Sequence, residues 1–342
     1  MQGEIILNER YVKQILFDKI GKKGQETLKT SKVVIVGAGA LGSVIANNLV
    51  RAGVGHITIV DRDYLELSNL QRQVLYREED VRKKLPKAEA AIKHLKDINS
   101  EVTLKAVIED FNPRTYKDII KGADIILDGT DNFTTRFLIN DIAIKNNIPW
   151  IYGGAVADTG MTMNIIPGKT PCLRCLMNDA PFAGHTQTCD TLGILNSTTG
   201  IIGNIQSLEA IKILLKDDNF FKGLLTISLW PLEWDVIRVE FKENCPSCHQ
   251  RRFKFLNNKL PTTSFLCGKN AIQIIPHKKK NLDIKEMAEV LERVGKVEYN
   301  KFLLRLKIKN FILTIFPDGR VIVKGTENPI EAKSLYAKYI GE

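Results

Sequence analysis

The sequence contains no apolar run long enough to cross a membrane, no internal repeat and no low-complexity tract. A membrane span needs roughly 20 apolar residues, and the first residues of the chain have neither the basic head nor the apolar middle of a signal peptide. We therefore expect a cytoplasmic protein without a membrane partner. With 44% hydrophobic and 26% charged residues among 342, the chain has an ordinary globular composition, which excludes disordered and fibrous classes.

Cysteine is scarce, with six residues in the chain. So few cysteines in a cytosolic protein of this size argue against a disulfide scaffold. Four of the six form two CxxC pairs, Cys172 with Cys175 and Cys245 with Cys248. Pairs at this spacing indicate metal ligands or redox groups.

Net charge is absent from most of the chain, since residues 1–250 carry 30 basic and 30 acidic side chains. The remaining 92 residues carry 19 basic and 9 acidic side chains, and so hold the whole formal charge of +10. This shift in composition predicts two domains, 1–250 and 251–342.

From Ser31 onward, short Val- and Ile-rich runs alternate with amphipathic stretches. Helical patterns span 41–52, 86–99 and 203–215, and the runs KVVIVG, HITIVD, VTLKAVI, ADIILDGTD and LLTISLW are typical of buried strands. This order predicts an α/β fold for the first domain: a doubly wound, Rossmann-like and mainly parallel sheet covered on both faces.

The second domain has the pattern of a small α+β unit. Strand-like runs near 271–276, 296–300, 302–308 and 311–325 accompany helical patterns over 284–294 and 331–339. Pro317-Asp318-Gly319 between two apolar runs predicts a hairpin, because Pro presets φ and Gly accepts positive φ. Its basic residues are compatible with nucleic acid or with an acidic protein partner, and its role stays open.

A glycine-rich loop follows the first of these strands and opens a helix. It reads Gly37-Ala38-Gly39-Ala40-Leu41-Gly42, and Asp61 ends the next strand 19 residues later. Such glycines allow close approach of a phosphate, the helix N-terminus offers unpaired N–H groups, and the carboxylate can accept from a ribose hydroxyl. The loop predicts a nucleotide site but does not choose between ATP and NAD, and a purely structural Gly-rich turn is the alternative.

Four polar residues farther along favour a triphosphate. Asn69, Arg72 and Lys87 follow Asp61 within 26 residues, and Asp131 follows a buried strand. Lys and Arg neutralise phosphate charge, and a carboxylate at the end of a strand can hold magnesium. An NAD-dependent oxidoreductase would need none of these residues. A helix cap is the structural alternative for Asp131-Asn132.

At this point the sequence resembles the ThiF/MoeB/HesA family, the bacterial and archaeal relatives of ubiquitin-activating enzymes. The resemblance is collinear over about residues 8–250. It rests on the segments ERYVKQILFDKIGKKGQETLKTSKVVIVGAGALGS, AGVGHITIVDRDYLELSNLQRQ, KAEAA, LDGTDNFTTR, PCLRC, TCDTLGIL and CPSC.

The resemblance implies that Asp61 binds the ribose of ATP, that Asn69, Arg72 and Lys87 bind its phosphates, and that Asp131 holds magnesium. The implied reaction is adenylation of the C-terminal carboxylate of a ubiquitin-like sulfur-carrier protein ending in Gly-Gly. A sulfur donor of the cysteine desulfurase or rhodanese type would then give a thiocarboxylate for thiamine synthesis, molybdenum or tungsten cofactor synthesis, or tRNA thiolation. The alternative is adenylation of a carboxylate carried on tRNA, as in the tRNA-modifying relatives.

One departure from the family pattern concerns a homodimer, which the resemblance also implies. The family's Arg-Tyr-x-Arg-Gln is here Arg10-Tyr11-Val12-Lys13-Gln14. The second Arg of the pattern reaches the nucleotide of the other subunit. Lys13 keeps its charge but loses the planar fork, so either Lys13 or Arg10 could reach the partner's ATP.

The cysteines carry three further expectations. Cys172, Cys175, Cys245 and Cys248 supply the four thiolates of a closed structural zinc site, in agreement with the family; a redox pair and haem attachment are the weaker alternatives. Cys189 follows a Gly- and Pro-containing loop and is either a catalytic nucleophile, as in some family members, or a spectator thiol. Cys267 is interpreted as a buried thiol, with a persulfide carrier as the alternative.

Overall fold

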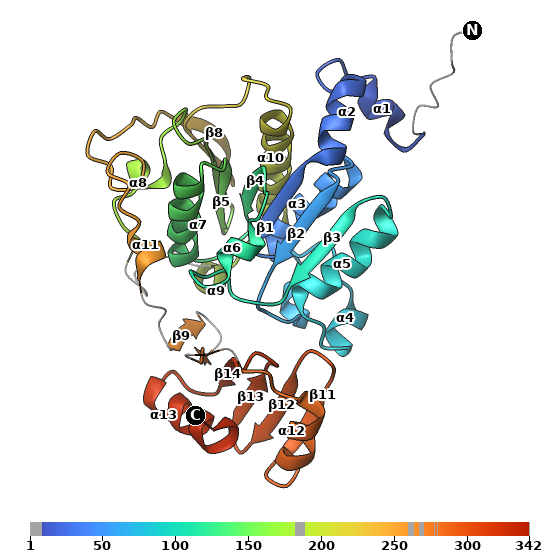
Figure 1. Ribbon diagram of the computed structural model, residues 1–342, viewed down its shortest axis with the longest axis vertical. Coiled ribbons are helices and arrows are strands. Elements are labelled where there is room, and N and C mark those ends of the chain that lie inside the picture. Colours follow the sequence, from blue (N-terminus) through green and yellow to red (C-terminus); the bar gives the residue numbers. More distant parts are fainter. Residues whose placement is uncertain are drawn as a thin grey trace. The chain divides into compact units, whose positions relative to one another are not determined.

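The computed structural model describes residues 9–181, 189–258, 263–266, 270–276, 278 and 280–341 (Figure 1). The chain divides into two compact units, 1–258 and 259–342. The division falls eight residues after the change in composition at residue 250. Each unit has a hydrophobic core of its own, so each is described by itself.

The first unit is built on an eight-stranded sheet of order β3-β2-β1-β4-β5-β6-β7-β8. The pairs from β3 to β5 in this order are parallel, whereas the pairs β5–β6, β6–β7 and β7–β8 are antiparallel. The strands are β1 (Lys32–Val36), β2 (His56–Val60), β3 (Thr103–Val107), β4 (Ile125–Asp128), β5 (Trp150–Val156), β6 (Thr159–Ile165), β7 (Leu224–Leu229) and β8 (Leu232–Ile237).

Helices cover both faces of this sheet (Figure 1), which confirms the doubly wound fold. One core cluster joins the sheet to α2 (Gly21–Thr30), α3 (Ala40–Arg51), α5 (Lys87–Ile98) and α10 (Asn196–Leu214). The other joins it to α6 (Tyr116–Ile119), α7 (Phe133–Asn146) and α11 (Lys254–Asn257). The short helices are η1 (Glu9–Tyr11), α1 (Val12–Ile15), η2 (Leu67–Asn69), α4 (Glu78–Arg82), α8 (Leu173–Leu176) and α9 (Cys189–Leu192).

The helix predicted over 203–215 begins seven residues earlier, at Asn196. The added residues, NSTTGII, include polar and Gly residues of low helix propensity, so the local pattern hides the first two turns. Tertiary packing holds them in place, since α10 packs closely on α3. A Cβ on Gly203 would lie 2.8 Å from the Cβ of Val44, which shows how near the two helices approach.

The second unit is a six-stranded antiparallel sheet of order β11-β12-β13-β14-β10-β9. Its helices α12 (Ile284–Leu291) and α13 (Pro329–Ile340) pack on one face of the sheet. The predicted hairpin is confirmed, with Gly319 at φ +84°. The strands are β9 (Thr263–Leu266), β10 (Ala271–Ile274), β11 (Lys296–Tyr299), β12 (Leu304–Ile308), β13 (Phe311–Ile315) and β14 (Val321–Lys324).

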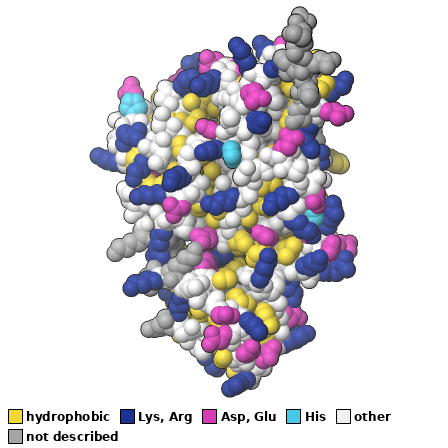
Figure 2. Space-filling view, turned by 45° about the vertical axis from the view of Figure 1, so that its right-hand side comes forward, with side chains coloured by type: hydrophobic (Ala, Val, Ile, Leu, Met, Phe, Trp, Pro, Cys, Tyr) yellow, Lys and Arg dark blue, Asp and Glu magenta, His cyan; other side chains and the backbone are white. Residues whose placement is uncertain are grey.

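The surface mixes charges of both signs. On the face that Figure 2 shows, Lys and Arg side chains are interspersed with Asp and Glu rather than gathered in one patch. Within the described ranges, no helix combines the length and the apolar character that a membrane crossing requires.

Candidate functional site

The glycine loop lies between β1 and α3 and has no room for side chains at two of its glycines. A Cβ on Gly37 would lie 2.4 Å from the carbonyl oxygen of Gly129, and Gly37 has φ +95°. A Cβ on Gly42 would lie 1.9 Å from the carbonyl oxygen of Gly37. These two glycines therefore allow the loop to close on α3 and on the end of β4.

Gly39 differs from its neighbours, because a Cβ there would meet only the Gly129 carbonyl oxygen, at 3.8 Å. Gly39 is the N-cap residue of α3, and no side chain caps this helix. The first turn of a helix has N–H groups without intrahelical partners and a partial positive charge. The space at Gly39 therefore adjoins a helix end that favours an anion.

Asp61 comes directly after β2 and is held by two backbone N–H groups. Its Oδ2 accepts from Ala38 N at 2.7 Å, and its Oδ1 accepts from Asp63 N at 2.7 Å. Burial raises the pKa of Asp61 above its ordinary value, whereas the charge of Lys87 opposes the rise. The bond to Ala38 fixes the carboxylate against the glycine loop, and each oxygen keeps a second lone pair for a ligand.

Lys87 opens α5 and is clamped by Asp63. Its backbone N–H donates to the Asp63 carbonyl oxygen at 2.9 Å, and its Nζ lies 3.2 Å from Asp63 Oδ2. Burial alone would lower the pKa of Lys87, but the carboxylates of Asp63, Asp61 and Asp131 raise it above its ordinary value. The site therefore holds a charged ammonium group that is nearly buried, with 8% of its side chain exposed.

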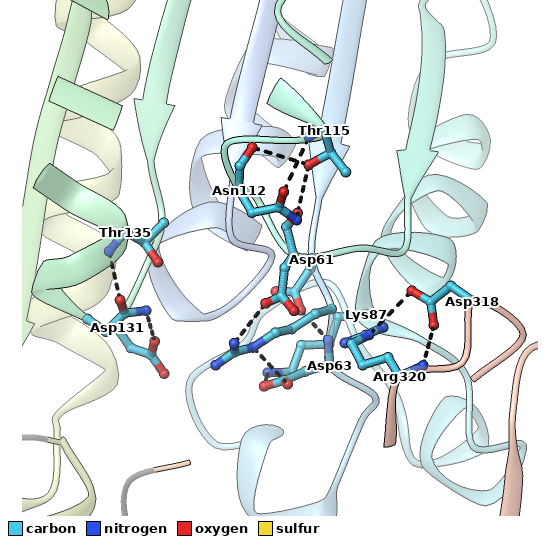
Figure 3. Close-up of polar contacts among 12 residues, drawn as sticks. Asp61, Asp63, Lys87, Asn112, Thr115, Asp131, Thr135, Asp318 and Arg320 are labelled. Atoms are coloured by element: carbon cyan, nitrogen blue, oxygen red, sulfur yellow. Dashed lines mark hydrogen bonds and ion pairs between the residues drawn. The ribbon is translucent and has the colours of Figure 1, made fainter. Parts of the chain in front are cut away.

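Figure 3 shows Asp61, Asp63 and Lys87 gathered at the end of β2, with Asp131 on the neighbouring ribbon that leads into α7. Asp131 is exposed, and its Oδ1 accepts from Asn132 Nδ2 at 3.3 Å. Asn132, not Asp131, caps α7, since its Oδ1 accepts from Thr135 N at 2.9 Å. The carboxylate of Asp131 is thus available near Lys87 without being needed as a cap.

The segment before Asp131 is held by buried charge. Asp128 ends β4 and is fully buried; its Oδ1 accepts from Thr130 N and Oγ1, and its Oδ2 accepts from Arg136 Nε at 3.2 Å. Burial raises the pKa of Asp128. Arg136 also donates to the Thr130 carbonyl oxygen at 2.9 Å. These contacts fix the loop on which Asp131 stands.

Three charged residues of this region were not predicted from the sequence: Arg62, Asp63 and Asp110. Arg62 donates to Asp110 Oδ1 at 2.7 Å and lies near Asp63, and Asp131 also contributes to its charged surroundings. Asp63 clamps Lys87, as described above. The only signal in the sequence is their place just after β2 and β3, where the carboxyl ends of parallel strands meet.

Asn69 and Arg72 lie in the segment between β2 and α5. Asn69 is buried and its Oδ1 accepts from Glu66 N at 3.1 Å, while Arg72 donates to the Ser68 carbonyl oxygen at 2.8 Å. Tyr76 ties the segment to the glycine loop by donating to the Ala38 carbonyl oxygen at 2.6 Å. The structure therefore anchors this segment to the loop.

Arg72 and Lys13 stand apart from the charged cluster. Within the described residues, no hydrogen bond or ion pair joins either one to Asp61, Lys87 or Asp131. Lys13 is exposed on α1. Arg10, the alternative to Lys13, donates to the Ile98 carbonyl oxygen at 3.0 Å and lies 3.8 Å from Glu101 of the same chain.

The four cysteines of the CxxC pairs meet, although 69 residues separate the pairs. Their sulfur atoms all lie within 4.8 Å of one another, with 3.5 Å from Cys172 to Cys245 and from Cys175 to Cys248. Tetrahedral zinc, with Zn–S bonds of about 2.3 Å, would space its sulfurs about 3.8 Å apart. The cluster therefore has the ligand type and spacing of a closed zinc site.

A buried carboxylate joins the cysteine cluster to α7. Asp141 accepts from Ser247 Oγ at 2.8 Å and from Phe255 N at 2.8 Å. Asn140 accepts from Leu173 N at 2.9 Å. Neighbouring residues of α7 thus hold both CxxC segments, and burial raises the pKa of Asp141.

The two remaining cysteines lie at the borders of the described ranges. Cys189 begins α9, but its side chain lies outside the described part of the chain, as do residues 182–188 before it. Cys267 also lies outside the described residues. Their chemical roles therefore remain the predictions made from the sequence.

Comparison with known proteins gives consistent matches. The sequence profile of the ThiF family matches residues 11–247. The chain is 41% identical over 336 residues to the sulfur carrier protein ThiS adenylyltransferase of Bacillus subtilis, covering 97% of this chain and 99% of that protein. It is 35% identical over 241 residues to the SAMP-activating enzyme E1 of Haloferax volcanii, covering 70% of this chain and 88% of that enzyme.

Solved structures match most of the chain in fold. The crystal structure of Escherichia coli MccB with ATP aligns with a TM-score of 0.61 and 25% sequence identity. The alignment covers 71% of this chain and 75% of the MccB chain. The matched proteins share the mixed α/β architecture described above.

Proposed function

The chain belongs to the ThiF family, and from that premise we propose that it adenylates the C-terminal carboxylate of a ubiquitin-like sulfur-carrier protein with ATP. The observation that carries the proposal is the group formed by the partly buried Asp61 and Asp63 and the buried Lys87 beside the open N-terminus of α3. This group offers a fixed carboxylate for a ribose and a fixed cation for phosphates, side by side at one edge of the sheet.

In the proposed complex the glycine loop takes the phosphates of ATP and Asp61 takes the ribose. Lys87, already charged through its carboxylate neighbours, neutralises phosphate charge. Arg72 and Asn69 would join it through the segment that Tyr76 anchors to the loop. Asp131 is suited to bind magnesium, because it is an exposed carboxylate and hard cations prefer carboxylate oxygens.

In the proposed reaction the protein contributes mainly the positioning of the reactants and the neutralisation of charge. The carboxylate oxygen of the carrier bonds to the α-phosphorus, the bond from that phosphorus to the leaving oxygen breaks, and pyrophosphate departs with the electron pair. The nucleophile is ionised at neutral pH, so no general base is needed. Positioning and neutralisation of developing charge are then the catalytic contributions, from Arg72, Lys87 and Asp131 with its magnesium.

The cysteines take different roles in the proposal. Cys172, Cys175, Cys245 and Cys248 hold structural zinc, since all four ligand positions of a tetrahedral ion are filled. Cys189 is proposed as the thiol that attacks the carbonyl carbon of the adenylated carrier, so that a thioester forms and AMP leaves; a spectator thiol is the alternative. The persulfide of a sulfur donor of the cysteine desulfurase or rhodanese type would then displace Cys189 from the thioester. The released thiol would attack the donor-side sulfur of the resulting acyl disulfide, which frees the thiocarboxylate and leaves a disulfide between Cys189 and the donor.

For the identity of the carrier, the span of the relatives is informative. The match to the ThiS adenylyltransferase extends over both units, whereas the match to the SAMP-activating enzyme covers 241 residues. We therefore favour a ThiS-like carrier. We also propose a homodimer in which Lys13 reaches the partner's nucleotide, because Arg10 is held by its own chain.

The test is isotope exchange between ATP and pyrophosphate with magnesium, using purified protein and a panel of carriers ending in Gly-Gly. We expect exchange with a ThiS-like carrier and none when its last glycine is deleted. Exchange with bulk tRNA and without any carrier would instead establish the tRNA-modifying reaction. Absence of exchange with every substrate would refute adenylation.

A further inference from the structure

The strands of the second unit are more basic than its helices. Residues 259–342 contain 16 basic and 9 acidic side chains. Many of the acidic residues belong to the helices, where Asp283 caps α12, Glu286 and Glu289 lie within it, and Glu331 lies in the first turn of α13. The strands carry four basic residues and one acidic residue, a net charge of +3 out of the unit's +7.

The strand register aligns three lysines in one row across the sheet. Lys296 of β11 is opposite Lys307 of β12, Lys307 is opposite Ile312 of β13, and Ile312 is opposite Lys324 of β14. With strands about 4.8 Å apart, the three lysines span roughly 15 Å. We name Lys296, Lys307 and Lys324 the lysine row.

The lysine row points away from the helices. Val297, Leu306 and Val323, each the immediate sequence neighbour of one lysine, pack with α12 and α13. Because successive side chains of a strand alternate between the two faces, the lysines lie on the face opposite the helices. All three lysines are exposed.

Two lysines of the row repel each other. Lys296 and Lys307 are direct cross-strand neighbours, and like charges at such positions are destabilising. Glu298 lies 3.7 Å from Lys296, but both side chains are largely exposed, at 46% and 76%, so this pair compensates little. A bound polyanion would remove the repulsion.

We propose that the lysine row binds the phosphodiester backbone of a structured nucleic acid. Lysine is depleted in protein–protein interfaces, whose centres need apolar side chains. The row has only two apolar residues, Ile312 between Lys307 and Lys324, and Ala271 beside Lys324. Lysine is, by contrast, a principal phosphate contact. The row has no aromatic side chain for base stacking, so the recognition is of backbone and not of sequence.

The test compares two triple variants of the full chain with the same loss of charge. One replaces the lysine row, as Lys296→Gln, Lys307→Gln and Lys324→Gln. The control replaces three exposed lysines of the helices in the same unit, as Lys285→Gln, Lys333→Gln and Lys338→Gln. Binding of labelled bulk tRNA and of a short DNA duplex is measured by fluorescence anisotropy over a range of salt concentrations.

We expect the slope of log K against log salt to be less steep in the row variant by about 2 to 3, because each lost phosphate contact reduces the magnitude of this slope by about 0.7 to 0.9. Its affinity at low salt should fall at least tenfold, while the control changes little. Equal binding of tRNA and duplex would identify any structured backbone as the ligand, and binding of tRNA alone would identify RNA.

Two results would overturn the proposal. If both triple variants weaken nucleic-acid binding equally, the attraction is a diffuse one to a basic protein. If the row variant binds nucleic acid normally but no longer binds an acidic carrier protein, the row is a protein-docking surface. Carrier-dependent ATP–pyrophosphate exchange is measured in parallel and should stay intact in both variants. The proposal is therefore independent of the adenylation reaction.

Discussion

Alanine substitutions at two glycines of the loop should separate folding from ATP binding. In Gly42→Ala the new Cβ would lie 1.9 Å from the Gly37 carbonyl oxygen, and real Cβ contacts are not shorter than 3.0 Å. The backbone must therefore move by at least about 1 Å, an overpacking that costs about 1–3 kcal/mol. At about 2–4 °C per kcal/mol for a unit of this size, the Tm should fall by roughly 2–12 °C.

Gly39→Ala should leave the Tm within about 2 °C of the wild type, because its Cβ meets only one atom, at 3.8 Å. The methyl group would nevertheless occupy the space before the N-terminus of α3, where we place the phosphates. We expect the KM for ATP to rise at least tenfold, about 1.4 kcal/mol, in the exchange assay. An unchanged KM for ATP in Gly39→Ala would refute the assignment of the loop as the phosphate site.

Three further predictions concern the cluster and the cysteines. Asp131→Asn should reduce exchange at least about a hundredfold with an unchanged Tm, because Asp131 is exposed; a normal rate would exclude its role with magnesium. Because the pKa of Lys87 is raised, its side chain stays fully protonated at every pH below the ordinary lysine pKa of about 10.4. The folding stability that depends on this charge is therefore fully present in that range. Deprotonation of Lys87 should therefore not raise the KM for ATP in the wild type between pH 6 and 9. Asp63→Asn should lower the pKa of Lys87, so that the KM for ATP begins to rise at a lower pH than in the wild type. Identical pH profiles of the KM in the two proteins would contradict the role of Asp63 in holding Lys87. Cys248→Ser should release zinc, measured with a colorimetric chelator, and lower the Tm, whereas Asp141→Asn should lower the stability by about 1–3 kcal/mol with zinc retained. A metal content near zero in the purified wild type would refute the zinc site.

The position of the glycine loop between a strand and a helix was predictable because its signal is local. Gly37, Asp61 and Asp131 each follow a buried strand, and the carboxyl ends of parallel strands meet at one edge of a sheet. The pairing of the CxxC segments was predictable for a different reason, since four thiolates imply one tetrahedral ion whatever their separation.

The strands β5 and β6 were not predicted, because glycines interrupt both runs. Gly153 is required there by packing, since a Cβ would lie 2.5 Å from Nε2 of Gln206 in α10. Gly160 is similarly close to Ile202 of the same helix. Such contacts join segments about 40 to 50 residues apart, so the local pattern carries no trace of them.

The sequence also did not reveal the charged residues whose roles depend on burial and on distant partners. Asp63 and Arg62 follow a strand, where the sequence alone favours solvated side chains, and Asp141 sits in the middle of a helix. Their importance depends on partners distant in sequence: Asp110 for Arg62, Lys87 for Asp63 and Ser247 for Asp141. Burial and long-range pairing are tertiary properties that periodicity and motif spacing do not encode.

In the proposed reaction a carrier carboxylate attacks the α-phosphorus of ATP in this site. The most direct measurement is a single-turnover reaction with ATP labelled at the α-phosphate, a ThiS-like carrier and magnesium, quenched and analysed for label on the carrier. We predict label on the carrier's C-terminal carboxylate with wild-type protein and none with Asp131→Asn. A carrier that stays unlabelled with the wild type, or one labelled equally by the variant, would contradict the account.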